Sequence, residues 1–190
     1  MILISHPRSG THLLAHILGV REFATYKGVW TLTVRQPKAI KRVLSNGSRI
    51  WVHYPYNDTL REFLEGWDGQ KRLLLRDPRD IIVSIAHFVE ACPGMYLNYI
   101  GGKQLSQMPF VDRVDWLIDV MRDPLYDHDR WRKTGLFQLY YYHEIVEHPA
   151  AASYNYNLVR GIVGGYKQDM TKKQIDRADK YYGELIEVWT

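Results

Sequence analysis

The chain has 190 residues, of which 46% are apolar and 24% charged, a composition that excludes a disordered or collagen-like chain. Its 25 basic and 21 acidic residues give a net charge of +4. The basic residues are scattered rather than gathered into a run, which suits an anionic ligand better than a long nucleic-acid track. The single cysteine, Cys92, excludes an internal disulfide and a cysteine-rich metal cluster, and it favours a reducing, cytoplasmic location.

The first residues do not have the pattern of a secretory signal. Four apolar residues at 1–4 are followed at once by Ser-His-Pro-Arg at 5–8, so there is no basic leader with a long apolar stretch. No run reaches the roughly 18 to 20 apolar residues that span a bilayer. We therefore expect one domain covering residues 1–190, with no membrane partner.

Short apolar runs alternate with longer segments of helical periodicity along the chain, and this alternation predicts strands connected by helices. The expected strands are 2–5, 49–53, 71–75 and 136–141. The expected helices are 11–18, 37–44, 58–65, one that begins at Pro78, 111–121, 127–132 and one that Thr171 caps and that ends at 182. Such an order predicts an α/β fold, with a central parallel sheet in a three-layer α/β/α arrangement and a helical C-terminal part over 150–190.

The longest expected loop lies between residues 90 and 110. It contains Pro93, Gly94, Gly101, Gly102 and Pro109, which disfavour regular structure. Long loops of compact domains commonly serve as lids or substrate-binding surfaces. We therefore expect this segment to shape a binding site.

The turn between the first strand and the first helix carries residue types that bind phosphate. Arg8 supplies a fixed positive charge, Ser9 and Thr11 supply hydroxyl donors, and Gly10 allows close approach of the backbone. A helix that follows a strand offers its first N–H groups to an anion. The turn is not a Walker A loop, because it lacks the GxxxxGK[ST] spacing and its lysine. Taken alone, it is explained as well by a capped turn with an incidental arginine.

A second turn of the same kind follows the third strand. Arg76 stands at the carboxyl end of that strand, and Ser84 stands about two helical turns further on. Two such turns in one sheet suggest a ligand with two separated anionic groups. On their own, Asp77 and Asp80 would simply favour the helix dipole, and Ser84 would be an ordinary helical residue.

Together the two turns resemble the sulfotransferases that use 3′-phosphoadenosine 5′-phosphosulfate (PAPS). Residues 7–11 read PRSGT and resemble the 5′-phosphosulfate loop of that family. Arg76, Pro78, Asp80 and Ser84 match its 3′-phosphate motif, RxPxDxxxS. The order of the motifs, the flanking strands and the spacing from arginine to serine all agree with the family.

Two further segments extend the resemblance to about residues 1–150. Residues 51–55, WVHYP, resemble the family's KTHLP segment, which implies that His53 is the catalytic histidine. Residues 140–149, YYYHEIVEHP, resemble its RYEDLVEDP-type stretch, which implies that Tyr142 contacts the adenine. The chain also departs from the family: Leu13 replaces a tryptophan that stacks on adenine, Trp51 replaces a lysine near the reacting centre, and no counterpart is identified for the C-terminal RKGxxGDWK-type segment that closes over the 3′-phosphate.

The resemblance implies a P-loop NTPase-like nucleotide-binding core, with PAPS as sulfuryl donor and 3′-phosphoadenosine 5′-phosphate (PAP) as product, and no metal. The implied cofactor-binding residues are Arg8, Ser9, Gly10, Thr11, His12, Arg76, Ser84 and Tyr142, and the implied catalytic residues are His53 and Arg8. The acceptor is expected to be a hydroxyl or amine of a small molecule or saccharide, and no nucleic-acid partner is expected. His12 and His16 have the i, i+4 spacing of a metal pair, but no HExxH glutamate accompanies them.

Two other functions fit the same residues. One is a nucleotide-binding module that has kept the fold and lost transfer, which the changes at Trp51 and Leu13 and the missing C-terminal segment favour. The other is a small P-loop kinase that uses ATP. By residue type alone, His53 is more simply a structural histidine at a strand end. The identity of the acceptor and the oligomeric state are not encoded in any pattern of the sequence.

Overall fold

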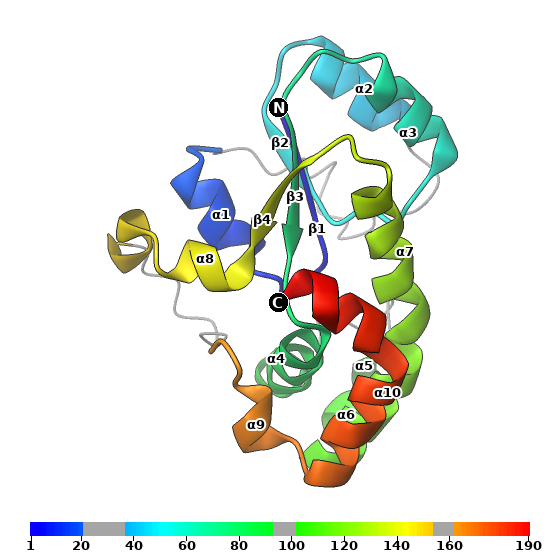
Figure 1. Cartoon of the computed structure of the whole chain (residues 1–190), viewed down its shortest axis with the longest axis vertical. Coiled ribbons are helices and arrows are strands. Elements are labelled where there is room, and N and C mark those ends of the chain that lie inside the picture. Colours follow the sequence, from blue (N-terminus) through cyan, green and yellow to red (C-terminus); the bar gives the residue numbers. More distant parts are fainter. Residues whose placement is uncertain (21–36, 93–101, 154–161) are drawn as a thin grey trace. The chain divides into compact units, whose positions relative to one another are not determined.

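The computed structural model describes residues 1–20, 37–92, 102–153 and 162–190 (Figure 1). Within these residues the chain has an α/β fold with a four-stranded parallel sheet. The chain divides into two compact units: a first unit of Met1–Leu75 with Tyr126–Tyr154, and a second unit of Arg76–Leu125 with Asn155–Thr190. In the part of the chain that is described, no helix combines the length and the apolar character that crossing a bilayer requires.

The sheet belongs to the first unit and has the order β2-β1-β3-β4 with all neighbours parallel. Its strands are β1 (Ile2–Ser5), β2 (Ile50–Val52), β3 (Lys71–Leu75) and β4 (Gln138–Tyr141). All four expected strands are confirmed, and β2 and β4 are shorter than expected. Because parallel strands end at the same edge of a sheet, the residues that follow the four strands start from one edge.

The first unit surrounds this sheet with short helices. They are α1 (Thr11–Ile17), α2 (Pro37–Ser45), α3 (Asp58–Glu65), the part of α7 (Arg122–Lys133) from Tyr126 onward, α8 (Tyr142–Val146) and the 3₁₀ helix η1 (Pro149–Ser153). Helices α1 and α8 lie on one side of the sheet and α7 lies on the other (Figure 1). The side chain of Asn57 caps α3 by accepting a hydrogen bond from the backbone N–H of Leu60 at 3.0 Å.

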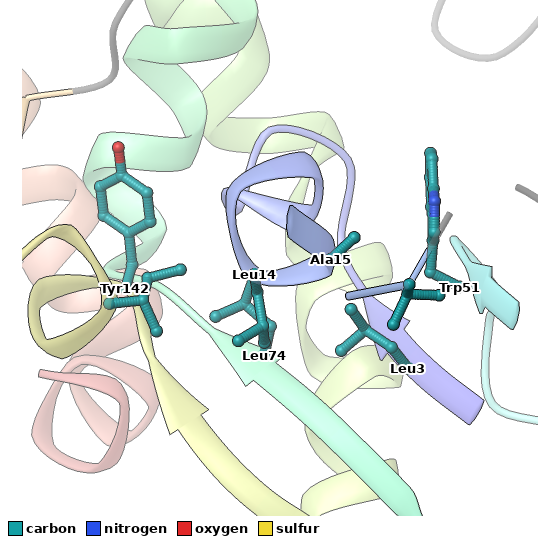
Figure 2. Close-up of a cluster of buried hydrophobic side chains, with 8 residues drawn as sticks. Leu3, Leu14, Ala15, Trp51, Leu74 and Tyr142 are labelled. Carbon is teal, nitrogen blue, oxygen red and sulfur yellow. The ribbon is translucent and has the colours of Figure 1, made fainter. Parts of the chain in front are cut away.

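Apolar side chains cover both faces of the sheet. On the face toward α1, Leu3 and Leu74 pack with Leu14, Trp51 and Tyr142 in a buried cluster (Figure 2). The side chains that alternate with them on β1 and β3, which are Ile2, Ile4, Leu73 and Leu75, are also 0% exposed. A sheet that is buried on both faces explains why its strands are nearly continuous apolar runs in the sequence.

The second unit is helical. It contains α4 (Pro78–Ala91), α5 (Gly102–Gln107), α6 (Phe110–Val120), α9 (Tyr166–Asp169) and α10 (Lys172–Trp189). Helices α4, α6 and α10 pack against one another. Thr171 begins α10 with a capping box in which its side chain accepts from the Gln174 N–H, so the predicted cap is confirmed.

Several helices differ from the expectation: α8 was not expected, and α5, α7 and α10 differ for identifiable reasons. Within the predicted 90–110 loop, α5 forms because buried Arg113 donates to the carbonyl oxygens of Leu105 and Met108 and so holds this turn of chain, while residues 93–101 lie outside the described residues. Helix α7 begins five residues earlier than predicted, since a proline is tolerated in the first helical turn. Helix α10 continues beyond residue 182 because Leu185 and Trp189 extend its buried stripe.

Candidate functional site

The loop from His6 to Gly10 has an unusual backbone. Arg8 has a φ of 68°, and it is the one non-glycine residue with positive φ in the described part of the chain. Gly10 has a φ of 97°. Ser9, between them, is fully buried, and its hydroxyl donates to the His6 carbonyl oxygen at 2.6 Å. A left-handed arginine costs about 1–3 kcal/mol, and such local strain is characteristic of loops that direct backbone N–H groups at an anion.

Tyr142 packs directly on this loop. A Cβ atom at Gly10 would lie 2.5 Å from Cδ2 and Cε2 of the Tyr142 ring, so glycine is required there by space as well as by φ. The ring belongs to the buried cluster with Leu14 and Ile145. Its hydroxyl points away from the other labelled side chains of this cluster (Figure 2). Tyr142 therefore supports the loop of residues 6–10, and its contact with adenine stays a prediction.

His53 follows β2 and reaches the end of β1. Its Nδ1 lies 3.0 Å from the Ser5 carbonyl oxygen and 3.2 Å from the Ser5 hydroxyl. Because a carbonyl oxygen only accepts, Nδ1 carries a hydrogen and donates it, and in the neutral ring Nε2 keeps a lone pair. This arrangement leaves Nε2 of His53 able to accept a proton, and the bond to Ser5 holds the ring at the strand end where the loop of residues 6–10 begins.

Burial lowers the pKa of His53 to about 3, although the ring is only half-buried. The bond to Ser5 acts in the opposite direction, and the nearby His6, His12 and Arg8 lower the pKa further when positively charged. The ring is therefore neutral at pH 7 and a weak base while no anion is bound. A bound anion would raise its pKa, because negative charge favours the imidazolium.

His12 and Trp51 lie beside His53. The Trp51 ring meets the His12 ring edge-on at 4.7 Å between centroids and the His53 ring at 5.4 Å. Burial, followed by the charge of Arg8, lowers the pKa of His12. Trp51 is 5% exposed and part of the apolar cluster, so it holds the two histidines by packing and brings no charge to them.

Two histidines that the sequence analysis gave no role, His6 and His128, are buried next to this group. The His6 Nδ1–H donates to the Pro7 carbonyl oxygen at 2.8 Å, and the His128 Nε2–H donates to the Leu74 carbonyl oxygen at 3.3 Å. Their ring centroids are 6.2 Å apart. Burial lowers the pKa of His6 to about 3 and that of His128 to about 4. Nothing in the spacing of residues 6 and 128 could have revealed this pair, since the fold alone brings α7 to the end of β1.

The second unit contains the other predicted set of residues. Arg76, Asp80 and Ser84 are all buried, at 4%, 3% and 5% exposure. Asp77 caps α4 by accepting from the Arg79 N–H at 2.9 Å. Its negative charge therefore lies at the helix N-terminus, where the sequence analysis expected it to favour the helix dipole. The Arg76 guanidinium donates to the Ile162 carbonyl oxygen at 3.4 Å. The start of α4 therefore meets a segment more than eighty residues away in the chain.

Asp80 fastens that segment. Its carboxylate accepts the backbone N–H of Gly164 at 2.8 Å and that of Tyr166 at 3.2 Å. Burial raises the pKa of Asp80, while the Arg76 guanidinium and these two N–H groups oppose the rise. The Arg79 guanidinium also lies over the Tyr166 ring, 4.1 Å from its centroid. The segment is thus held by both oxygens of the Asp80 carboxylate and by a cation–π contact.

The segment that Asp80 contacts is rich in glycine. Residues 161–167 read GIVGGYK, with two glycines and a lysine at the spacing of RKGxxGDWK and a tyrosine where that pattern has tryptophan. Gly165 stands where that pattern has aspartate, so the match is partial, and a role of this segment as the family's C-terminal segment stays a prediction. Within the described residues 162–167, the segment lies against Arg76 and Asp80 of the other predicted motif.

The structure thus brings the predicted residues together in two groups. In the first unit, Ser9, Gly10, Thr11, His53 and Tyr142 gather around the end of β1. In the second unit, Arg76 and Ser84 lie near the start of α4. Among the described residues no cluster of three or more His, Cys, Asp or Glu side chains is arranged to hold a metal ion. No protein-family model matches the chain, and no curated protein matches it at a significant level.

Proposed function

We propose that the protein is a sulfotransferase that transfers the sulfuryl group of PAPS to a hydroxyl or amine of a small-molecule or saccharide acceptor. The proposal includes the finer description of the fold, a three-layer arrangement with a P-loop-like core, and a cytoplasmic location. The observation that carries it is the meeting of a strained, glycine-containing anion loop with a histidine whose Nε2 is a proton acceptor, both at Ser5.

The loop has the features that a sulfuryl donor requires. Arg8 and the loop N–H groups would stabilise the negative charge that develops on the 5′-phosphate oxygen as the S–O bond breaks. The hydroxyl of Thr11, the first residue of α1, would donate to the same group. The donor supplies the sulfuryl group and leaves as PAP with the electron pair of the broken bond. No metal is needed in this scheme, because the charge is met by arginine and backbone dipoles.

His53 would take the acceptor proton on Nε2 while the acceptor oxygen or nitrogen bonds to sulfur. Its ring is already oriented, since Nδ1–H donates to the Ser5 carbonyl oxygen at 3.0 Å. A positioned general base typically contributes about 10²- to 10⁴-fold to the rate. In the second unit, Arg76, Ser84 and the 162–167 segment are proposed to hold the 3′-phosphate.

One observation favours the alternative of a binding module without transfer. The pKa of His53 is lowered to about 3, and a base this weak is poorly matched to a reaction at neutral pH. The loop would bind PAP equally well in that case. Transfer itself must therefore be measured separately from nucleotide binding.

Binding is tested by thermal unfolding with PAP and with ATP and magnesium. At 100 times its dissociation constant, PAP should stabilise the protein by about 2.7 kcal/mol, a rise of roughly 5 to 10 °C for a chain of this size. Arg8→Gly removes the guanidinium charge of the loop and relieves the strain of the positive φ. Arg76→Gln removes the guanidinium charge proposed to bind the 3′-phosphate in the second unit. Each should weaken PAP binding about 10- to 100-fold, as expected for a lost charged hydrogen bond. Arg42→Ala, at an exposed site on α2, is the matched control.

Transfer is tested by following PAP release from PAPS with panels of phenols, amines and simple saccharides. His53→Asn keeps an N–H donor for the Ser5 carbonyl oxygen and removes the base, so it should bind PAP normally and lose transfer by about 10²- to 10⁴-fold. PAP binding without transfer by the wild type would select the binding module. Magnesium-dependent ATP binding that outcompetes PAP would select a kinase, and the absence of any PAP binding would reject the proposal.

A further inference from the structure

Ser5 makes a hydrogen-bonded connection that no motif includes. Its hydroxyl lies 2.6 Å from the Thr11 hydroxyl and 3.2 Å from Nδ1 of His53. Its own backbone carbonyl also accepts from that Nδ1. Ser5 and Thr11 are buried, at 1% and 3% exposure. One residue at the end of β1 therefore touches both the anion loop and the histidine.

The Ser5 carbonyl oxygen determines where the hydrogen of the His53 ring lies. Because the Ser5 carbonyl oxygen cannot donate, Nδ1 of the neutral His53 ring carries the hydrogen, and the Ser5 hydroxyl can only accept from it. The Ser5 O–H then points elsewhere, and the Thr11 oxygen at 2.6 Å is placed to accept it. In that arrangement the single hydrogen of the Thr11 hydroxyl is directed away from Ser5. The chain runs from His53 to Ser5 to Thr11 and onward.

From this order we infer that Ser5 is a positioning residue that transmits anion binding in the phosphate loop to His53. The inference rests on the proposed function, in which an anionic donor accepts from Thr11. Hydrogen bonds in a chain polarise one another. An anion on Thr11 makes that oxygen a better acceptor for Ser5, and Ser5 a better acceptor for the His53 N–H. The lone pair on Nε2 gains proton affinity as a result.

This coupling addresses the weakness of His53 as a base. The titratable and charged groups that face the ring are His6 and Arg8 of the loop, His12 of α1 and His128 of α7. All of them disfavour the imidazolium when they carry charge. A donor bound in the loop would oppose them through space, and the Ser5 chain adds a contribution through hydrogen bonds. The base becomes competent when the donor is in place.

The test reads the His53 ring directly and needs no acceptor. Proton–nitrogen spectra of the ¹⁵N-labelled full chain at pH 7.5, with and without saturating PAP, give the tautomer and the chemical shift of the hydrogen on Nδ1. The signal is assigned by its loss in His53→Asn. In the wild type, PAP should move this hydrogen downfield, because the bond to Ser5 strengthens. In Ser5→Ala the displacement should fall about twofold, in line with the strength of charge-assisted relative to neutral bonds.

Two further variants separate the hydroxyl from general effects on folding. Thr11→Val has nearly the same shape and breaks the chain at its next link, so it should lose the same part of the displacement at PAP saturation. Thr134→Val is the matched control: it removes a hydroxyl of the first unit that lies outside the loop and donates to the Trp131 carbonyl oxygen at 2.7 Å, and it should keep the full displacement. An equal displacement in wild type and Ser5→Ala would overturn the inference.

Failure of the proposed function has a different outcome. If PAP does not bind the wild type, the same spectra are recorded with inorganic sulfate, which tests the loop without a nucleotide. A sulfate-induced displacement that falls in Ser5→Ala would keep the Ser5 connection and reject the nucleotide proposal. No displacement with either anion would reject the connection itself.

Discussion

Lowering the pH from 8 to 5 should destabilise the first unit through two buried histidines, His6 and His128. Their pKa values in the folded chain are about 3 and about 4, below the value of about 6.5 expected when unfolded. The unfolded chain therefore binds protons first, so the stability is fully present above about pH 6.5 and is lost as the pH falls toward the folded pKa.

The size of the effect follows from these values. At pH 5 each histidine favours the unfolded state by about 2 kcal/mol relative to pH 8. Both rings are still neutral in the folded chain at pH 5, so they do not yet repel each other and the two contributions add to about 4 kcal/mol. Domains are stabilised by about 5–15 kcal/mol in total. The loss is therefore a large part of the whole, and acid unfolding should begin near pH 4 to 5.

Urea unfolding at pH 8, 7, 6 and 5, followed by tryptophan fluorescence, measures this loss, and buried Trp51 and Trp131 report on the first unit. The matched variants are His6→Asn and His128→Gln. Each keeps an N–H donor for the carbonyl oxygen that its ring contacts and has no titrating group. The double variant should lose about 4 kcal/mol less than the wild type between pH 8 and 5. An unchanged pH dependence in the double variant would show that the two rings are not buried in neutral form.

Two other substitutions have clear expectations. Gly10→Ala would place Cβ 2.5 Å from the Tyr142 ring at a φ of 97°, so it should cost about 1–3 kcal/mol of stability and abolish PAP binding. Gly19→Ala is the control with backbone strain alone, because its φ is 64° and no atom lies within 4 Å of the new Cβ. An equal loss of stability in both variants would show that the contact with Tyr142 has no effect. Asp80→Asn replaces an acceptor oxygen by an N–H donor, so exchange of the backbone amide hydrogens of residues 162–166 should become about 10-fold faster or more. Unchanged exchange rates would show that this carboxylate does not hold the segment.

The strands and most helices could be predicted because local patterns determine them. The apolar runs of β1 and β3 are buried on both faces, and Thr171 has the residues of a capping box at its own helix start. The α5 helix could not be predicted, since it depends on the Arg113 guanidinium, which comes from a different helix. Local glycines and prolines indicated a loop there, and a tertiary contact overrode them.

The candidate site likewise contains residues that local sequence patterns indicate and residues that only tertiary contacts reveal. The residues of the loop at 7–11 could be proposed from the sequence because they are consecutive and of distinctive types. His6 and His128 were not found, because their proximity depends on how α7 reaches β1. Ser5 was placed in the first strand correctly, but its role depends on a contact with residue 53 that no local pattern contains. The conformation of Arg8, with a φ of 68°, was equally hidden, since arginine rarely adopts it.

The proposed activity implies an order of events. The groups that would attract an anionic donor to the loop, above all Arg8, are among those that lower the pKa of His53 to about 3. Without a bound donor, the positive charge of these groups would leave His53 unable to take the proton of an acceptor that bound first at neutral pH. Once the donor neutralises that field and engages Thr11, the same histidine regains proton affinity. Donor binding should therefore precede productive acceptor binding, which also keeps the base from acting before a sulfuryl group is present.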